Sequence, residues 1–257
     1  MFDAGWFDRT AGFDASAWSA VLLAPFIGSF LGVVIRRLPK GRPIAWTRSR
    51  CEECGSTLSV RDLVPVLSWL SERGRCRFCG RWLGWFYPGV ELAALGIALI
   101  AVSFDQGVEI WLDCILGWTL LALAWIDAQH WLLPDRLSLP LVLIGLAAAL
   151  IFDPAALTDR ALGAALGYLA LRAVALLYRR VRGRDGLGQG DAKLLAAAGA
   201  WVGATALPQV ILIAAFAGLL AAACLRLSGV RLGPFSALPF GPFLAFATWL
   251  VWLMPVI

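Results

Sequence analysis

The feature that most constrains this chain is a series of long apolar blocks separated by short polar segments. Most of the eight blocks have about the 17–25 residues that a helix needs to cross a bilayer. They cover roughly residues 17–35, 87–104, 110–126, 137–152, 161–178, 192–206, 208–225 and 238–255. None alternates apolar and polar residues as a strand does, and a helix satisfies its own backbone in lipid. The pattern therefore predicts an all-α polytopic membrane protein with about eight transmembrane helices.

The composition excludes several other classes of protein. Hydrophobic residues make up 60% of the chain and charged residues 15%, against about 45–50% and about 25% in soluble domains. So few charges cannot cover a soluble globule of this apolar content. The single histidine, His130, also excludes any intrachain site that needs two histidines, such as the H-E-x-x-H zinc site of metalloproteases.

The positive charges predict the orientation in the membrane. With eight spans and an outer N-terminus, 19 of the 22 Lys and Arg residues fall in inner loops and two fall in outer segments. Basic loops are retained on the cytoplasmic side during insertion. We therefore expect both termini on the outer side. The net charge of +5 fits this topology signal beside anionic lipid better than nucleic-acid binding.

The one sizeable polar region, residues 36–86, contains two C-x-x-C pairs. They are formed by Cys51 with Cys54 and by Cys76 with Cys79. Four thiolates can close a tetrahedron around Zn²⁺, and Gly55 and Gly80 follow the pairs where a tight turn is needed. Two disulfides or four unlinked thiols are the alternatives, and a reducing cytoplasm disfavours the disulfides. The pattern favours a structural zinc site.

Two aspartates lie at the ends of apolar blocks that are distant in sequence. Asp127 directly follows the third block, and Asp191 directly precedes the sixth, after the glycines Gly186, Gly188 and Gly190. The predicted topology places both at the cytoplasmic ends of their spans. Either one alone is commonly a helix cap or an interfacial charge. Two carboxylates brought together share a proton, so that one acts as a base on water and the other as an acid. The pair therefore predicts an aspartyl peptidase.

Two other classes of function fit parts of this pattern. A proton-coupled transporter also uses carboxylates among many spans, although its charges are expected near the bilayer midplane in broken helices. A scaffold that docks other proteins through a zinc loop would not need the aspartates at all.

The combination of short segments resembles the type 4 prepilin peptidases, which are bifunctional membrane enzymes of bacterial pilus and type II secretion systems. The matching segments are PFIGSFLGVVIRRLP (25–39), SRCEECG (49–55), VPVLSWL (64–70), RGRCRFCG (73–80), YPGVEL (87–92), WIDAQHWLLPD (125–135), GQGDAKLLAAAGAWVG (188–203) and PFGPFLAFA (239–247). The resemblance covers nearly the whole chain after residue 24. The sequence departs from the usual pattern at Gly32, Leu63 and Gln129.

This resemblance implies an enzyme in the bacterial inner membrane with periplasmic termini and a cytoplasmic active site. Its substrates are prepilins or pseudopilins, whose leader peptide it removes after a glycine. The family's catalytic aspartates match Asp127 and Asp191. The resemblance also implies methylation of the new N-terminal residue with S-adenosylmethionine as the methyl donor, for which no motif is evident here.

Three parts are predicted along the chain. Residues 1–35 form a periplasmic segment and the first helix, residues 36–86 form the zinc-binding and methyltransferase-associated loop, and residues 87–257 form the membrane peptidase domain. Glu91, near the start of the second span, has two interpretations: an interfacial acid that reaches to water, or a residue that recognises the basic residues of a leader peptide.

Overall fold

The computed structural model describes residues 14–44, 48–51, 53–183, 188–229 and 238–254. In these residues the regular structure is helical, apart from two isolated β-bridges. The chain divides into two compact units. Met1–Gly32 and Arg48–Ile115 form the first, and Val33–Thr47 and Leu116–Ile257 form the second. The three parts predicted from the sequence remain a prediction.

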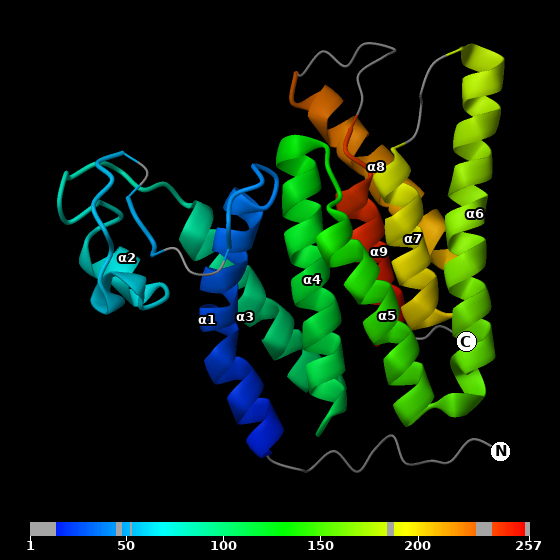
Figure 1. Ribbon diagram of the computed structural model, residues 1–257, viewed down its shortest axis with the longest axis horizontal. Helices are drawn as coiled ribbons and strands as arrows, with labels where there is room; N and C mark the ends of the chain where they lie inside the picture. The colour runs from blue at the N-terminus through cyan, green and yellow to red at the C-terminus, as the bar shows by residue number, and fades with distance from the viewer. Residues whose placement is uncertain (1–13, 45–47, 52, 184–187, 230–237, 255–257) are drawn as a thin grey trace. The chain divides into compact units, whose positions relative to one another are not determined.

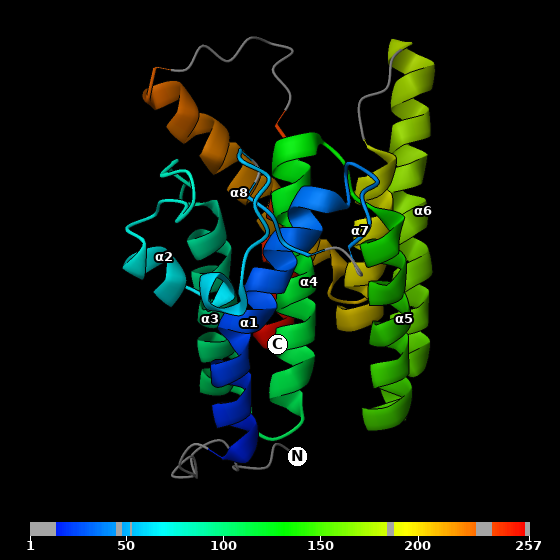
Figure 2. The same cartoon turned by 60° about the vertical axis from the view of Figure 1, so that its left-hand side comes forward.

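The first unit is built around α1 (Ala15–Arg37) and α3 (Phe86–Phe104), which lie side by side (Figures 1 and 2). A Cβ at Gly28 would lie 2.6 Å from the Cα of Glu91, so only glycine permits this close approach of the two helices. The loop between them carries a short 3₁₀ helix, η2 (Val60–Leu63), and α2 (Leu67–Ser71).

Glu91 joins this loop to α3. Its side chain is buried and accepts a hydrogen bond from the backbone N–H of Val66 at 2.7 Å and one from the Ser29 side chain. The interpretation of Glu91 as an acid that reaches to water is therefore wrong, because the protein itself supplies its hydrogen-bond donors. Val66 has a φ of +60°, which costs a β-branched residue on the order of 1–3 kcal/mol. The bond to a buried carboxylate holds it there.

Helix α4 (Glu109–His130) begins in the first unit and continues from Leu116 in the second. The second unit also contains five further α-helices. They are α5 (Asp135–Phe152), α6 (Leu157–Arg182, after the 3₁₀ turn η3, Pro154–Ala156), α7 (Gln189–Val202), α8 (Leu207–Leu227) and α9 (Gly241–Leu253). Helix α7 contacts α5, α6, α8 and α9 and is almost entirely buried (Figure 1). Its Trp201 donates a hydrogen bond from Nε1 to the carbonyl oxygen of Leu141 at 2.9 Å. Helix α7 is therefore the centre of this unit.

Glycines allow α6 and α7 to touch along their backbones. A Cβ at Gly199 would lie 2.2 Å from the carbonyl oxygen of Gly163, and a Cβ at Gly167 would lie 2.5 Å from that of Leu195. Gly163 and Gly167 form a G-x-x-x-G pair, the spacing that lets membrane helices pack closely.

The predicted all-α membrane architecture is confirmed. Each of the eight predicted blocks corresponds to a helix, and six described helices are long and apolar enough to cross a membrane. The other two, α7 and α9, have 14 and 13 residues, fewer than the roughly 17 that a full span needs. The count of eight spans therefore remains a prediction.

Candidate active site

The two predicted aspartates line one cavity of the second unit. Asp127 lies in the last turn of α4 and Asp191 in the first turn of α7, and the residues are 6% and 8% exposed. The cavity has a volume of about 900 Å³. Its other lining residues come from the turn after α1, the α4–α5 connection, the starts of α5 and α7, and the segment before α9. Side chains 64 positions apart in sequence thus reach the same space.

The start of α9 fixes Asp127. The backbone N–H of Gly241, the first residue of α9, donates to Asp127 Oδ2 at 3.0 Å in a buried hydrogen bond. A Cβ at position 241 would lie 2.6 Å from the same oxygen, so the contact requires glycine. No role for Gly241 was predicted from the sequence. The available signal was a Gly–Pro step at the beginning of an apolar block, which is typical of a helix start.

The glycine segment before α7 fixes Asp191. The Asp191 carboxylate accepts a hydrogen bond from the backbone of Gly188, and it lies close enough to Asp127 for the two carboxylates to interact electrostatically. A Cβ at Gly190 would lie 2.7 Å from the side chain of Leu133. Gly186, the other glycine of the predicted motif, lies outside the described residues. Two buried carboxylates in one cavity can share a proton, as paired general acids and bases do.

An ion pair forms part of the cavity lining. Lys193 Nζ lies 2.5 Å from Asp135 Oδ1 and joins the start of α5 to the first turns of α7. Both residues line the cavity that contains Asp127 and Asp191. Lys193 therefore pairs with Asp135, the residue that follows Pro134.

The four cysteines of the loop form a second candidate site, in the first unit. Their Sγ atoms all lie within 4.8 Å of one another, whereas a tetrahedron with Zn–S bonds of 2.3 Å sets them about 3.8 Å apart. Gly55 and Gly80 have φ values of +71° and +68°, which confirms the predicted tight turns. The donor set fits a tetrahedral metal ion.

Fold and site together define a polytopic helical membrane protein with a pair of buried aspartates. Two family models match the chain: the bacterial peptidase A24 N-terminal domain over residues 22–104, and the type IV leader peptidase family over residues 114–223. Together they cover both the cysteine loop and the aspartate pair. The chain belongs to the type IV leader peptidase family, as the resemblance found in its sequence implied.

Full-length relatives agree with this assignment. The chain is 38% identical to a protein of Dichelobacter nodosus over 90% of this chain and 89% of the relative. It is 40% identical to one of Burkholderia pseudomallei over 88% and 81%, and 38% identical to one of Pseudomonas aeruginosa over 91% and 88%. All three relatives are named prepilin leader peptidase/N-methyltransferase. These names give no support to the transporter alternative. No solved structure matches the chain.

Proposed function

We propose that this protein is a membrane aspartyl endopeptidase that removes the leader peptide of type IV prepilins or pseudopilins. The observation that carries the proposal is the placement of Asp127 and Asp191, from different helices, in one cavity. The names of the full-length relatives supply the substrate class. A role in type IV pilus assembly or type II secretion follows from that substrate class.

The chemistry uses the two carboxylates in opposite protonation states. The ionised one takes a proton from a water molecule, which attacks the carbonyl carbon of the scissile peptide bond. The protonated one gives its proton to the carbonyl oxygen, which forms a gem-diol intermediate. As the C–N bond breaks, the proton taken from water passes to the leaving amine, and one hydroxyl of the diol returns its proton to the other carboxylate. No nucleophilic serine or cysteine is needed. The backbone N–H groups of Gly241 and Gly188 hold the carboxylates in place through the reaction.

The peptidase proposal is tested by replacing each aspartate with its amide. Asp127→Asn and Asp191→Asn keep the shape of the side chains and remove their acid–base chemistry. Each should lower the rate of leader cleavage by at least about 10³-fold, because residues that act as one unit fail together. The measurement is the mass of a purified prepilin after incubation with the purified enzyme in detergent.

A matched control comes from Asp153, an exposed aspartate at the end of α5 that caps the next turn with its side chain. Asp153→Asn keeps that capping acceptor and should leave cleavage unchanged. Full cleavage by either active-site variant would refute the assignment of the pair.

The same protein is proposed to methylate the N-terminal residue that cleavage exposes, with S-adenosylmethionine as the methyl donor. This second activity rests on the names of the relatives, which include N-methyltransferase, and we assign no residue to the methyl donor. A cleaved pilin that gains the mass of one methyl group only when the donor is present would support it. An unmodified product in the presence of donor would contradict it.

The cysteine cluster is proposed to bind a structural Zn²⁺ through Cys51, Cys54, Cys76 and Cys79. The ion would tie the two C-x-x-C turns together in a loop that has little apolar core of its own. Metal analysis should find about one zinc per chain, and Cys51→Ser combined with Cys76→Ser should abolish it. Cys224→Ser, at an exposed cysteine outside the cluster, is the control. Unchanged zinc in the double variant would refute this ligand set.

We further propose that the protein lies in the bacterial inner membrane, with both termini periplasmic and the active site cytoplasmic. The distribution of Lys and Arg supports this orientation. Its partners are then prepilins or pseudopilins and membrane lipid, without nucleic acid. A membrane-impermeant reagent should modify the cysteine loop in inverted membrane vesicles and spare it in intact spheroplasts.

A further inference from the structure

The cysteine loop carries an apolar surface that neither the metal site nor the aspartate pair explains. Leu67, Leu70, Trp82 and Trp85 are 65%, 57%, 50% and 67% exposed, and we call these four residues the α2 surface. The ring of Trp69 joins its parts, with centroids 5.5 Å from Trp82 and 4.4 Å from Trp85. Apolar patches of this kind on a folded loop mark an interaction site.

A hydrogen bond fixes the position of this surface along the axis of α3. Helix α3 has 19 residues and a length of about 28 Å, close to the hydrocarbon thickness of about 30 Å. The start of α3 must therefore lie near the boundary between headgroups and acyl chains. Glu91 lies five residues into α3, about 7.5 Å along its axis, and it binds the N–H of Val66, the residue just before α2, at 2.7 Å.

This bond places α2 beside the first turns of α3 instead of in the water beyond its end. Figures 1 and 2 both show α2 level with the N-terminal half of α3. Trp85, which belongs to the same surface, immediately precedes the first residue of α3. The exposed leucines and tryptophans thus lie at the depth where a bilayer begins.

The residue types of this part of the loop match a lipid boundary. Tryptophan is enriched at membrane interfaces because its ring is apolar and its N–H is polar. Arg73 and Arg75 lie two and four residues after the end of α2, and both are exposed. Residues 48–85 carry seven arginines and four acidic residues, a balance that attracts anionic headgroups.

We propose that the α2 surface lies on the membrane, with Leu67, Leu70, Trp82 and Trp85 among the upper acyl chains and Arg73 and Arg75 at anionic headgroups. The cysteine loop is then held against the lipid surface by α2 and by the Val66–Glu91 bond. This makes the loop a membrane-apposed module, and a substrate that emerges from the bilayer meets it without crossing open water.

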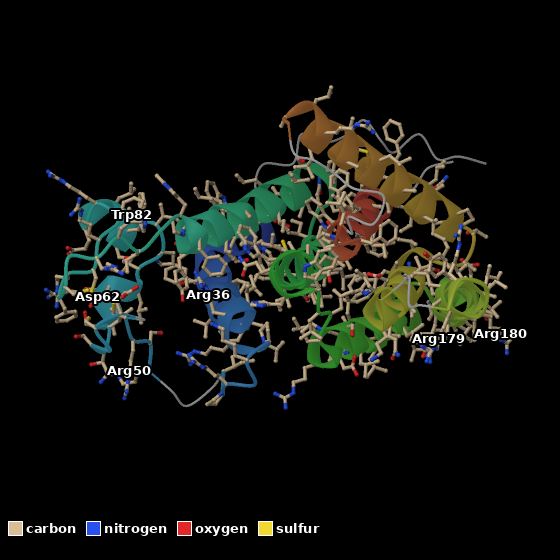
Figure 3. All side chains as sticks on the ribbon, turned by 90° about the horizontal axis from the view of Figure 1, so that it is seen from above. Arg36, Arg50, Asp62, Trp82, Arg179 and Arg180 are labelled. Carbon is tan, nitrogen blue, oxygen red and sulfur yellow. The ribbon has the colours of Figure 1, made fainter. Side chains whose placement is uncertain are left out.

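The test uses the full-length protein in nanodiscs that contain phosphatidylglycerol and phosphatidylcholine. A photoreactive benzoylphenylalanine replaces Leu67 in one variant and Leu70 in a second, so that the result does not depend on one variant folding. The control replaces Thr57, an exposed residue of the same loop that pairs with Arg50. Figure 3 shows Arg50 at the opposite end of the loop from Trp82. After illumination, mass spectrometry identifies what is attached to each position.

We expect lipid adducts at positions 67 and 70 and none at position 57. Arg73→Gln combined with Arg75→Gln should reduce the adducts in phosphatidylglycerol nanodiscs to the level seen in pure phosphatidylcholine. Absence of lipid adducts at both leucines would overturn the proposal. So would attachment to a second copy of the chain or to an added prepilin in place of lipid, since the surface would then be a protein-binding site.

Discussion

The hydrogen bond from Gly241 to Asp127 allows a sharp test of the proposed active site. In Gly241→Ala the new Cβ would begin 2.6 Å from Asp127 Oδ2, so the carboxylate must move by several tenths of an ångström. The move weakens a buried hydrogen bond to a charged group, which contributes about 1.5–3 kcal/mol. Misplacing a catalytic group by about 1 Å costs up to about 10²-fold in rate. We therefore expect kcat for leader cleavage to fall by about 10- to 100-fold.

The assay measures kcat and KM for a purified prepilin, together with the melting temperature of the enzyme in the same detergent. Gly218→Ala is the matched control, because its Cβ would meet Phe243 of α9 at 3.5 Å, an ordinary contact. A variant that misplaces Asp127 should lose kcat with little change in KM, whereas general damage to α9 should lower the melting temperature as well. An unchanged kcat in Gly241→Ala would refute the view that α9 positions Asp127.

Three further changes probe the surroundings of the two sites. Gly199→Ala, whose Cβ would lie 2.2 Å from the carbonyl oxygen of Gly163, should destabilise the α6–α7 packing by about 1–3 kcal/mol or more; a thermal melt that is unchanged would contradict this. Hydrogen bonds from Ser59 and the charge of Arg77 lower the pKa of Asp62, so its ionised form stabilises the loop at neutral pH, and this contribution is lost as the pH falls through the lowered pKa. Asp62→Asn should remove that pH dependence from amide hydrogen exchange over residues 59–63. Lys193→Met breaks a partly exposed ion pair with Asp135 and should change stability by less than about 1 kcal/mol, as a thermal melt would measure.

The positions of the helices could be predicted because a bilayer imposes length and apolarity on each span. The ends of the helices could not be read with the same accuracy. The third apolar block ends at residue 126, whereas α4 continues to His130, because a helical backbone satisfies its own hydrogen bonds whatever its side chains are. The sixth block extends to residue 206, whereas α7 ends at Val202. The next residue, Gly203, has a φ of +87°, which no helix accommodates.

The side chains of the candidate sites could be predicted more fully than the backbone hydrogen bonds that hold them in place. The cysteine pairs carry a spacing that indicates chemistry, and Asp127 and Asp191 lie at the ends of apolar blocks on the same predicted side of the membrane. The structure brings each set together. The bond from Gly241 to Asp127 joins residues 114 positions apart through a backbone N–H, a group that every residue except proline possesses. Such a donor leaves no signature in residue type. The same reason hides the bond between Val66 and Glu91, which joins the loop to α3.

Because separate elements hold the two aspartates, their cooperation can be measured directly. Asp127 is held by the start of α9 and Asp191 by the glycine segment before α7, so that a change in one carboxylate leaves the support of the other in place. If the pair hydrolyses the peptide bond as one unit, Asp127→Asn, Asp191→Asn and the double variant should all fall to the same residual rate of cleavage. Independent contributions would instead multiply, and the double variant would be slower than either single variant by the other's full factor. A rate in the double variant that is the product of the two single losses would therefore exclude a shared proton as the basis of catalysis.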